Sequence, residues 1–344
     1  MKIAVDAMGG DRAPAQVVKG ACLAARDLDV GIILVGDESV LRGHLRDTVA
    51  DVPSAISIQH ATQQVEMHEA PSSVARKKRD SSIWVATELV QRGEAAAVIS
   101  AGNTGATMVS AFFLWGVLKG IERPAIAATL PTLNGQAIML DVGATVDCLP
   151  HQLYQFAIMG HEYAKQVLGE VNPKIGLLSI GEEDEKGNEV TREAFRMLKN
   201  SSLNFVGNVE GRDVYTGMAD VIVCDGFIGN VGLKISEGVA EVMTKMLVKD
   251  ISHSRIGKLG YALLRPAFHR FKKRVDYAEF GGAPLLGVNG TCVICHGRSS
   301  AKAIYSAVRL ARQLIHQKMN ERIQGTVTRE TAFVSTQDST SAKG

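Results

Sequence analysis

The chain has 344 residues, 46% of them hydrophobic and 34 of them glycine, so it is long enough for one large α/β domain or two lobes and is rich in loops. Its 38 basic and 36 acidic residues leave a net charge of +2, so no overall field draws it to nucleic acid or to a membrane. The first residues lack the apolar core of a signal peptide, and five scattered cysteines are typical of reduced thiols, so we expect a cytoplasmic protein.

Predicted strands alternate with predicted helices, which is the pattern of a mainly parallel sheet with helices on both faces. Strands are expected at residues 3–6, 31–36, 56–58, 95–100, 125–130, 136–141, 174–180, 205–209 and 221–224. Asn134-Gly135 between two apolar runs predicts a hairpin. The uncharged run 95–118 is long enough to span a bilayer, but the polar loop 102–105 interrupts it, so we interpret it as a buried strand, a loop and a buried helix.

No linker divides the chain, so the sequence predicts a single α/β/α domain over residues 1–325. The remainder, 326–344, is polar and rich in small residues, and we predict a disordered tail there.

Polar or glycine-rich clusters follow five of the predicted strands, at residues 6–11, 102–105, 141–144, 182–188 and 225–230. Ligands bind at the carboxyl ends of strands in open α/β sheets, so the five clusters together predict a site. In the last cluster, Gly226 and Gly229 allow close approach of a ligand, and the following helix start favours an anion. Thr104 offers a hydroxyl to a phosphate, and Lys186 is the one cation in its acidic loop.

A basic amphipathic segment covers residues 253–275, where apolar residues recur every three or four positions among seven positive charges. It suits an anionic membrane surface, an acidic partner protein, or the packing of a dimer. We expect Pro266 to begin a second helix within it. The candidate contact residues are Leu263, Leu264, Phe268, Arg270, Phe271, Lys272, Lys273 and Arg274.

Several other chemistries lack their motifs. Cys292 and Cys295 lie three apart in a predicted strand, so their side chains point to opposite faces and cannot share a metal, and no metal is expected. The absence of GxGxxG after the first strand disfavours a dinucleotide cofactor, and no cofactor is expected. Neither a GxSxG nor an HExxH motif is present, so serine and zinc hydrolases have little support.

Taken together, these segments resemble the PlsX family of bacterial phosphate acyltransferases over about residues 1–325. The resemblance rests on Asp6-Ala-Met-Gly-Gly-Asp11, Ser100-Ala-Gly-Asn-Thr-Gly-Ala106, Glu122-Arg-Pro124, Asp141-Val-Gly-Ala144, Gln155-Phe-Ala-Ile-Met-Gly160, Ile180-Gly-Glu-Glu183 with Lys186-Gly187, Val223-Cys-Asp-Gly-Phe-Ile-Gly-Asn-Val231, Gly281-Gly282 with Leu285-Leu-Gly287, and His296-Gly297. Two positions depart from the family pattern: Thr145 stands where Asn is usual, and Phe280 where Tyr is usual.

The resemblance implies a three-layer α/β/α sandwich shared with phosphotransacetylases and isocitrate/isopropylmalate dehydrogenases. It implies that acyl-[acyl carrier protein] and inorganic phosphate give acyl phosphate and free carrier protein in phospholipid synthesis. It further implies a homodimer, in some members peripheral on the inner face of the cell membrane, with Lys186 and Asn230 as the catalytic pair. The substrate-binding candidates are Asp6, Gly9, Gly10, Asp11, Gly102, Asn103, Thr104, Gly105, Asp141, Gly143, Glu183, Asp225, Gly226, Gly229, Gly282 and His296.

Three other functions stay open at this stage. A phosphotransacetylase that uses acyl-CoA would need almost the same site, although the basic segment favours an acidic carrier protein. A nicotinamide-dependent decarboxylating dehydrogenase is compatible with the same fold. A non-catalytic membrane scaffold would use only the amphipathic segment.

Overall fold

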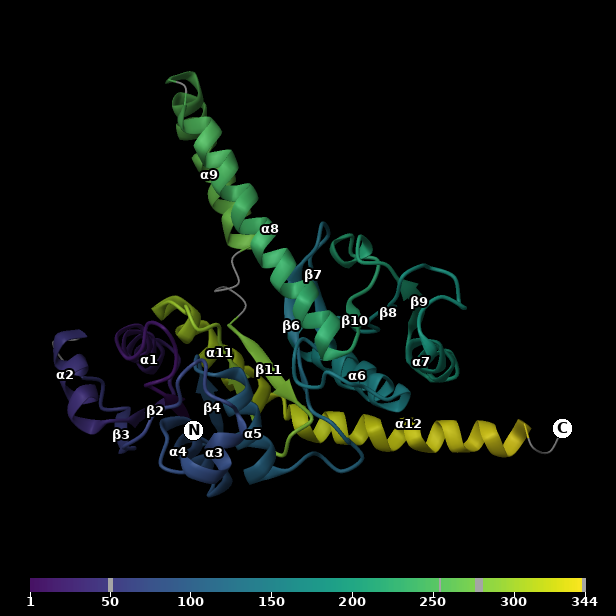
Figure 1. The fold of residues 1–344 in the computed structure, drawn as a ribbon, viewed down its shortest axis with the longest axis horizontal. Coiled ribbons are helices and arrows are strands. Elements are labelled where there is room, and N and C mark those ends of the chain that lie inside the picture. The colour runs from purple at the N-terminus through teal and green to yellow at the C-terminus, as the bar shows by residue number, and fades with distance from the viewer. Residues whose placement is uncertain (49–51, 254, 276–280, 342–344) are drawn as a thin grey trace.

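The computed structural model describes residues 1–48, 52–253, 255–275 and 281–341, which form two mainly parallel sheets flanked by helices (Figure 1). The first sheet has the order β3-β2-β1-β4-β12-β11-β5, from β1 (Lys2–Asp6), β2 (Gly31–Gly36), β3 (Ile56–His60), β4 (Ala97–Ser100), β5 (Ala125–Ile126), β11 (Ala283–Leu286) and β12 (Cys292–Ile294). The second has the order β6-β7-β10-β8-β9, from β6 (Ala128–Pro131), β7 (Gln136–Leu140), β8 (Ile175–Leu178), β9 (Phe205–Val209) and β10 (Val221–Val223). The α/β/α class is confirmed, but with two sheets where one was expected.

Helices cover both faces of each sheet. Their bounds are α1 (Ala15–Asp27), α2 (Glu38–Thr48), α3 (Ser72–Lys77), α4 (Ser82–Gln91), α5 (Thr104–Trp115), α6 (Pro150–Tyr163), the π-helical turn η1 (Ala164–Leu168), α7 (Glu189–Lys199), the 3-10 turn η2 (Asp213–Tyr215), α8 (Gly226–Ser252), α9 (Arg255–Val275), α11 (Ala301–His316) and α12 (Met319–Ser341).

The layering follows from the two-residue period of the strands. In β1, Ile3 and Val5 belong to the buried cluster that contains residues of α1 and α11, whereas Ala4 belongs to the cluster that contains residues of α4 and α5. Successive side chains therefore enter opposite cores, which is why these strands are apolar at every position rather than at alternate ones.

The apolar run 125–130 does not form the single strand that the sequence predicts. It divides into β5, at the edge of the first sheet, and β6, at the edge of the second. Between them, the Ala127 N–H donates to the Pro284 carbonyl at 3.0 Å, which directs the chain from one sheet to the other. The hairpin at Asn134-Gly135 is confirmed, because β6 and β7 pair antiparallel with Pro131 opposite Gln136.

The run 95–118 forms β4, a loop and α5, as predicted, but α5 is not fully buried. Phe112 and Phe113 are 43% and 61% exposed, so one side of the helix faces outward. Among the residues that the structure describes, no helix combines the length and the apolar character needed to cross a bilayer.

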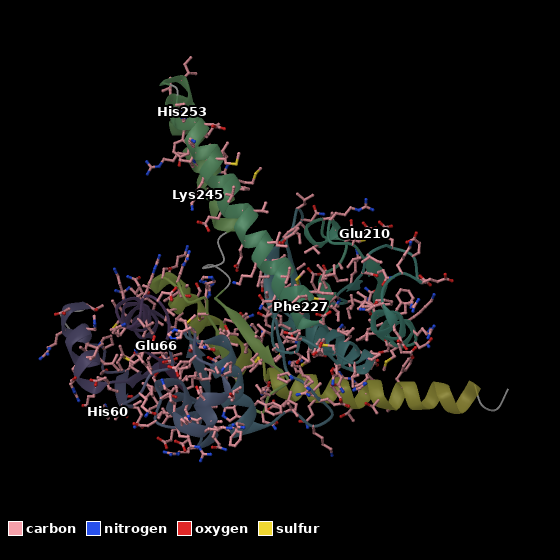
Figure 2. All side chains as sticks on the ribbon, viewed as in Figure 1. His60, Glu66, Glu210, Phe227, Lys245 and His253 are labelled. Carbon is pink, nitrogen blue, oxygen red and sulfur yellow. The ribbon has the colours of Figure 1, made fainter. Side chains whose placement is uncertain are left out.

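Helices α8 and α9 form a hairpin that projects from the body of the molecule (Figure 1). Figure 2 places Phe227 at the base of α8, with Lys245 and His253 progressively nearer the tip. Helix α9 continues through Pro266, contrary to the expectation that a new helix starts there. A proline inside a helix removes one backbone hydrogen bond, and the packing of α9 along α8 supports the helix across this position.

The first residues of the predicted disordered tail are helical in the structure. Residues from 326 onward continue α12, and Thr326 and Glu330 are buried. The Thr326 hydroxyl donates to Glu162 of α6 at 2.6 Å, and the Tyr154 hydroxyl, also on α6, donates to Glu330 at 2.8 Å. Polar residues at this spacing face α6, so the polarity that indicated disorder serves helix docking instead.

Candidate active site

The predicted clusters gather in two groups, one for each sheet, rather than on one common edge. Strands β1, β4 and β12 are adjacent and parallel, so their carboxyl ends bring together the loop after Asp6, the loop after Ser100 and His296. Strands β7, β10 and β8 are likewise adjacent and parallel, and they present Asp141, Asp225 and the loop that contains Lys186.

Asp6 organises the first group from inside the protein. Its carboxylate is buried and accepts a hydrogen bond from the Ser100 hydroxyl at 2.7 Å, and burial raises its pKa. A Cβ added to Gly9 would lie 2.4 Å from this carboxylate and 2.9 Å from the backbone of Gly102, so only glycine fits there. Asp6 therefore holds the two loops together.

Gly10 and Asp11 join the same group to the segment after β12. Gly10 has φ +108°, in the region that favours glycine, and an added Cβ would lie 2.8 Å from the Ala101 carbonyl. The next residue, Asp11, donates its backbone N–H to the Gly297 carbonyl at 2.8 Å. These contacts fix the loop beside His296.

Asn103 and Thr104 have different roles at the start of α5. The Asn103 side-chain oxygen caps the helix by accepting from the Ala106 N–H at 3.0 Å. Its amide group donates to the carbonyls of Glu66, Met67 and Glu69. Thr104 is exposed, whereas Gly105 packs against Pro71. Among Asn103, Thr104 and Gly105, Thr104 is thus the one whose side chain is exposed.

Asp141 holds the corresponding turn of the second group. Its buried carboxylate accepts backbone N–H groups from Ile126, Gly143, Ala144 and Thr145 at 2.6–3.1 Å. Burial raises its pKa to about 6, although these hydrogen bonds act in the opposite direction. Asp141, which was predicted to bind substrate, therefore has both carboxylate oxygens occupied by backbone N–H groups.

The position that departs from the family pattern, Thr145, also has a structural contact. Its hydroxyl donates to the Pro124 carbonyl at 3.1 Å, and its own carbonyl accepts the Gly226 N–H at 2.8 Å. The other departure, Phe280, lies outside the described residues.

The loop after β10 packs tightly on the Asp141 turn. A Cβ on Gly226 would lie 2.5 Å from the Asp141 carboxylate, and one on Gly229 would lie 1.9 Å from the Asp141 carbonyl. Asp225 caps α8 by accepting the N–H groups of Phe227 and Ile228 at 2.9 and 2.8 Å. Asp225 thus shapes the helix start, which delivers Asn230 one turn later.

Asn230 lies in a cleft between the two groups, in a pocket of about 170 Å³. Four predicted site residues from separate segments line it: Thr104, Asn230, Gly282 and His296. The Asn230 amide nitrogen also lies close to Gly143, where an added Cβ would be 2.6 Å away. Because the pocket lies between the ends of two sheets, it is the best candidate for a reaction centre among the described residues.

The two charged side chains among the lining residues, Lys234 and Glu237, are absent from the sequence-based prediction. Both lie on α8, at i+4 and i+7 from Asn230, and their side chains form an ion pair at 3.0 Å. That helical spacing is the signal that could have identified them. Burial, followed by the positive charge of Lys234, lowers the pKa of His296. Nδ1 of His296 accepts the Arg298 N–H at 3.1 Å, which assigns the proton of the neutral ring to Nε2.

Lys186 and Glu183 belong to the exposed loop after β8, and neither is among the residues that line the Asn230 pocket. The Glu183 carbonyl accepts the Lys186 N–H at 3.0 Å and the Asn208 amide at 2.8 Å, which fixes the turn. Beyond this turn, Asn188 and Thr191 line a pocket together with Asp225. The Lys186 loop is therefore next to the start of α8.

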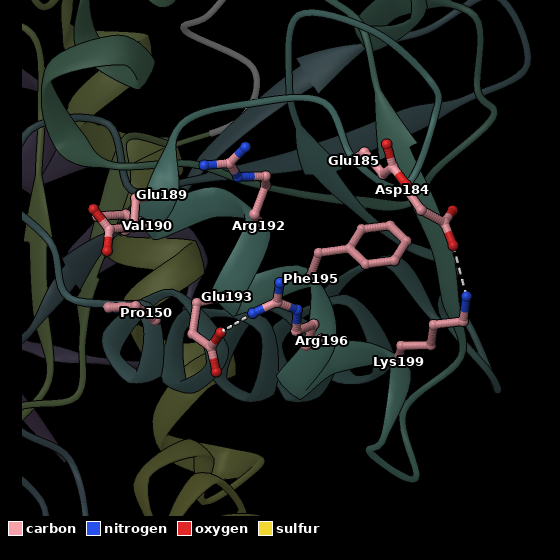
Figure 3. Close-up of a pocket in the computed structure, with 10 residues that line it drawn as sticks. All are labelled: Pro150, Asp184, Glu185, Glu189, Val190, Arg192, Glu193, Phe195, Arg196 and Lys199. Atoms are coloured by element: carbon pink, nitrogen blue, oxygen red, sulfur yellow. Dashed lines mark hydrogen bonds and ion pairs between the residues drawn. The ribbon is translucent and has the colours of Figure 1, made fainter.

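A larger depression of about 1030 Å³ lies between this loop and α7 (Figure 3). Charged side chains dominate its walls, and two of its three cations, Arg196 and Lys199, pair with Glu193 and Asp184, both at 2.6 Å, whereas Arg192 lines the depression as well. Neither Lys186 nor Asn230 lines it. Its volume therefore does not make it the better candidate for the reaction centre.

In the described part of the chain, no three His, Cys, Asp or Glu side chains group in a way that could hold a metal ion. Cys292 and Cys295 are buried, and burial raises the pKa of both thiols, to about 12 for Cys295.

Sequence comparison shows what the chain is similar to. Residues 1–322 match the family described as "Fatty acid synthesis protein". A protein of Geobacter sulfurreducens named phosphate acyltransferase is 55% identical over 324 residues, which cover 94% of this chain and 93% of that protein. Another of that name, from Pelotomaculum thermopropionicum, is 51% identical over 327 residues and covers 95% of each.

Solved structures show a similar fold. A phosphotransacetylase from Streptococcus pyogenes has a TM-score of 0.63 at 18% identity, over 92% of this chain and 94% of that chain. A second phosphotransacetylase, from Staphylococcus aureus, has a TM-score of 0.61 at 16% identity, with the same coverage. Identity this low shows the fold alone.

Proposed function

The chain belongs to the fatty acid synthesis protein family and is a phosphate acyltransferase, and we propose that its acyl donor is acyl-[acyl carrier protein] and that its product supplies phospholipid synthesis. Identity of 55% over nearly the whole length of a relative with that name carries the assignment as a phosphate acyltransferase. The carrier protein as donor is supported by the basic residues of α9, which suit an acidic partner. A purely scaffolding role does not fit that name.

In the proposed reaction, a phosphate oxygen attacks the thioester carbonyl, the C–S bond breaks, and the carrier leaves as a thiol that takes up the proton lost by phosphate. Because thiolate is a good leaving group and phosphate is itself the nucleophile, positioning and charge stabilisation are the main tasks of the protein. The reaction needs no covalent intermediate.

We assign the charge stabilisation to Asn230 and Lys186. Asn230 is supported by its place in the cleft, where its amide can donate to the carbonyl oxygen as negative charge develops. Lys186 is supported by the position of its loop, because the residues that follow it, Asn188 and Thr191, line a pocket with Asp225 at the start of α8. Thr104 and His296 line the opposite wall of the pocket, where the exposed Thr104 hydroxyl provides a further donor.

The donor is tested by following phosphate-dependent release of thiol from palmitoyl-[acyl carrier protein] and from palmitoyl-CoA. We expect the carrier protein to be the better substrate by kcat/KM, because an acidic partner can meet exposed basic residues of α9 such as Arg265 and Arg270. Equal or faster turnover of the CoA thioester would instead support a phosphotransacetylase. Hydride transfer from a 2-hydroxy acid to a nicotinamide cofactor would support the dehydrogenase.

We further propose that the α8–α9 hairpin contacts an anionic membrane and that the protein is a homodimer. Apolar side chains on α9 are exposed, among them Leu263 at 75%, Leu264 at 56% and Phe271 at 53%. The other apolar candidate, Phe268, packs on the Tyr261 ring, with the ring centroids 5.0 Å apart. Arg270 is exposed, whereas the structure does not describe the side chains of residues 272–274.

Flotation with liposomes that contain anionic lipid tests this contact. Replacement of Phe271 by Ser removes an exposed apolar anchor, so we expect less protein to float while thiol release in solution is unchanged. Sedimentation of the same samples measures the oligomeric state. Unchanged flotation would rule out this contact, and a monomer would rule out the dimer.

A further inference from the structure

An apolar groove continues from the Asn230 pocket along α8. Its volume is about 470 Å³, and its walls include Leu130 and Pro131 of β6, Tyr215 of η2, and Leu233, Val239 and Ala240 of α8. Leu233, Thr129 and Glu237 line both the groove and the Asn230 pocket, so the two cavities are continuous.

The polar groups on the groove walls are already engaged. The Tyr215 hydroxyl bonds to the Ser236 hydroxyl, which in turn donates to the Gly232 carbonyl at 2.8 Å. The Thr129 hydroxyl bonds to the buried Tyr163, and the Glu237 carboxylate pairs with Lys234. A ligand in the groove therefore meets apolar surface and satisfied polar groups, which favours a hydrocarbon over a polar molecule.

The two connected cavities thus have different chemistry at their ends. Asn230, Lys234 and His296 provide polar groups at one end, and Val239 and Ala240 provide an apolar surface at the other. Ten residues separate Asn230 from Ala240, which is about 15 Å along a helix. A molecule with a reactive polar head and an extended apolar tail matches this arrangement.

We propose that the groove holds the hydrocarbon chain of the acyl thioester and of the acyl phosphate product, with Val239 and Ala240 setting the preference for chain length. This inference rests on the proposed function. A groove of about 470 Å³ has room for roughly fifteen groups the size of a water molecule, at about 30 Å³ each. A long-chain acyl group fills it, whereas a short chain leaves the Ala240 end empty.

The test is the ratio of kcat/KM for palmitoyl and butyryl thioesters of the same carrier protein. Ala240→Phe places a ring at the far end of the groove, so the chain loses contact with two or more methylenes. Full burial of one methylene is equivalent to about fourfold in affinity, so we expect the palmitoyl-to-butyryl ratio to fall about tenfold. The butyryl value itself should be unchanged.

Gly238→Phe is the matched control, because it adds the same ring to the other side of α8, where nothing lies within 4 Å of an added Cβ. It should leave the ratio unchanged. Val239→Ser tests the groove without added bulk: Val239 is 56% exposed, so the protein should fold, and the ratio should again fall.

Three outcomes would overturn the inference. One is an unchanged ratio in both Ala240→Phe and Val239→Ser. Another is an equal loss for both chain lengths, which indicates a disturbed reaction centre. The third is an unchanged ratio with dissociation of a dimer, which indicates that a second copy of the chain covers the groove. Absence of thiol release by the unmodified protein with either chain would instead refute the proposed function.

Discussion

Asn230→Ala and Lys186→Ala are each expected to lower phosphate-dependent thiol release on the order of 10²-fold, because each removes one group that stabilises charge in the transition state. Both side chains are exposed. Neither makes a side-chain hydrogen bond or ion pair within the part of the chain that the structure describes, so thermal stability should change little. The loss should appear mainly in kcat for Asn230, whose amide acts on charge that develops during the reaction.

Lys199→Ala is the matched control for Lys186. Lys199 is an exposed lysine on the neighbouring helix α7, and its partner is Asp184 at 2.6 Å. Its removal should leave the rate near normal, whereas a similar loss in both lysine variants would indicate a general effect of positive charge. If Lys186→Ala alone were fully active, Lys234, which lines the cleft with Asn230, would become the better candidate for the phosphate cation.

Much of the cleft could be predicted from sequence because strand ends have a local signature. Apolar residues followed by Asp and Gly indicated the turns at Asp141 and Asp225, and the structure places both at strand ends. The division into two sheets had no such signature. The run 125–130 is equally apolar on both sides of Ala127, and the bond that redirects it comes from Pro284, more than 150 residues later in the chain.

Sequence patterns also do not distinguish a polar side chain that binds a ligand from one that holds a turn. Asp6, Asn103 and Asp141 were expected to contact substrate, yet each is buried and accepts hydrogen bonds from the protein itself, although the Oδ1 atom of Asp6 has no hydrogen-bond partner among the described residues. Short polar side chains at strand ends suit both roles, because they can accept backbone N–H groups as readily as they can meet a ligand. Their partners are set by neighbouring strands, which the local sequence does not reveal.

Asp141 should make the stability of the protein depend on pH. The pKa of Asp141 is about 6 in the folded protein, above the ordinary value of 3.8 that applies to the unfolded chain, because burial disfavours the charged carboxylate. Between these values the folded protein binds more protons than the unfolded chain, so the free energy of unfolding rises as pH falls. The contribution of this one group should be about 2 kcal/mol at pH 4 relative to pH 7, since each pKa unit is equivalent to about 1.4 kcal/mol and the unfolded group is itself partly protonated at pH 4.

Urea denaturation of the unmodified protein and of Asp141→Asn, repeated between pH 4 and pH 7, isolates this contribution because the other titrating groups are common to both. The stability of the unmodified protein relative to the variant should increase as pH falls, mostly between pH 6 and pH 4. If the variant does not fold, the carboxyl carbon resonance of Asp141 in the unmodified protein gives the same information, with a midpoint near 6. A midpoint below 4 would mean that the four backbone N–H groups outweigh burial, and Asp141 would then stabilise the turn more at neutral pH than in acid.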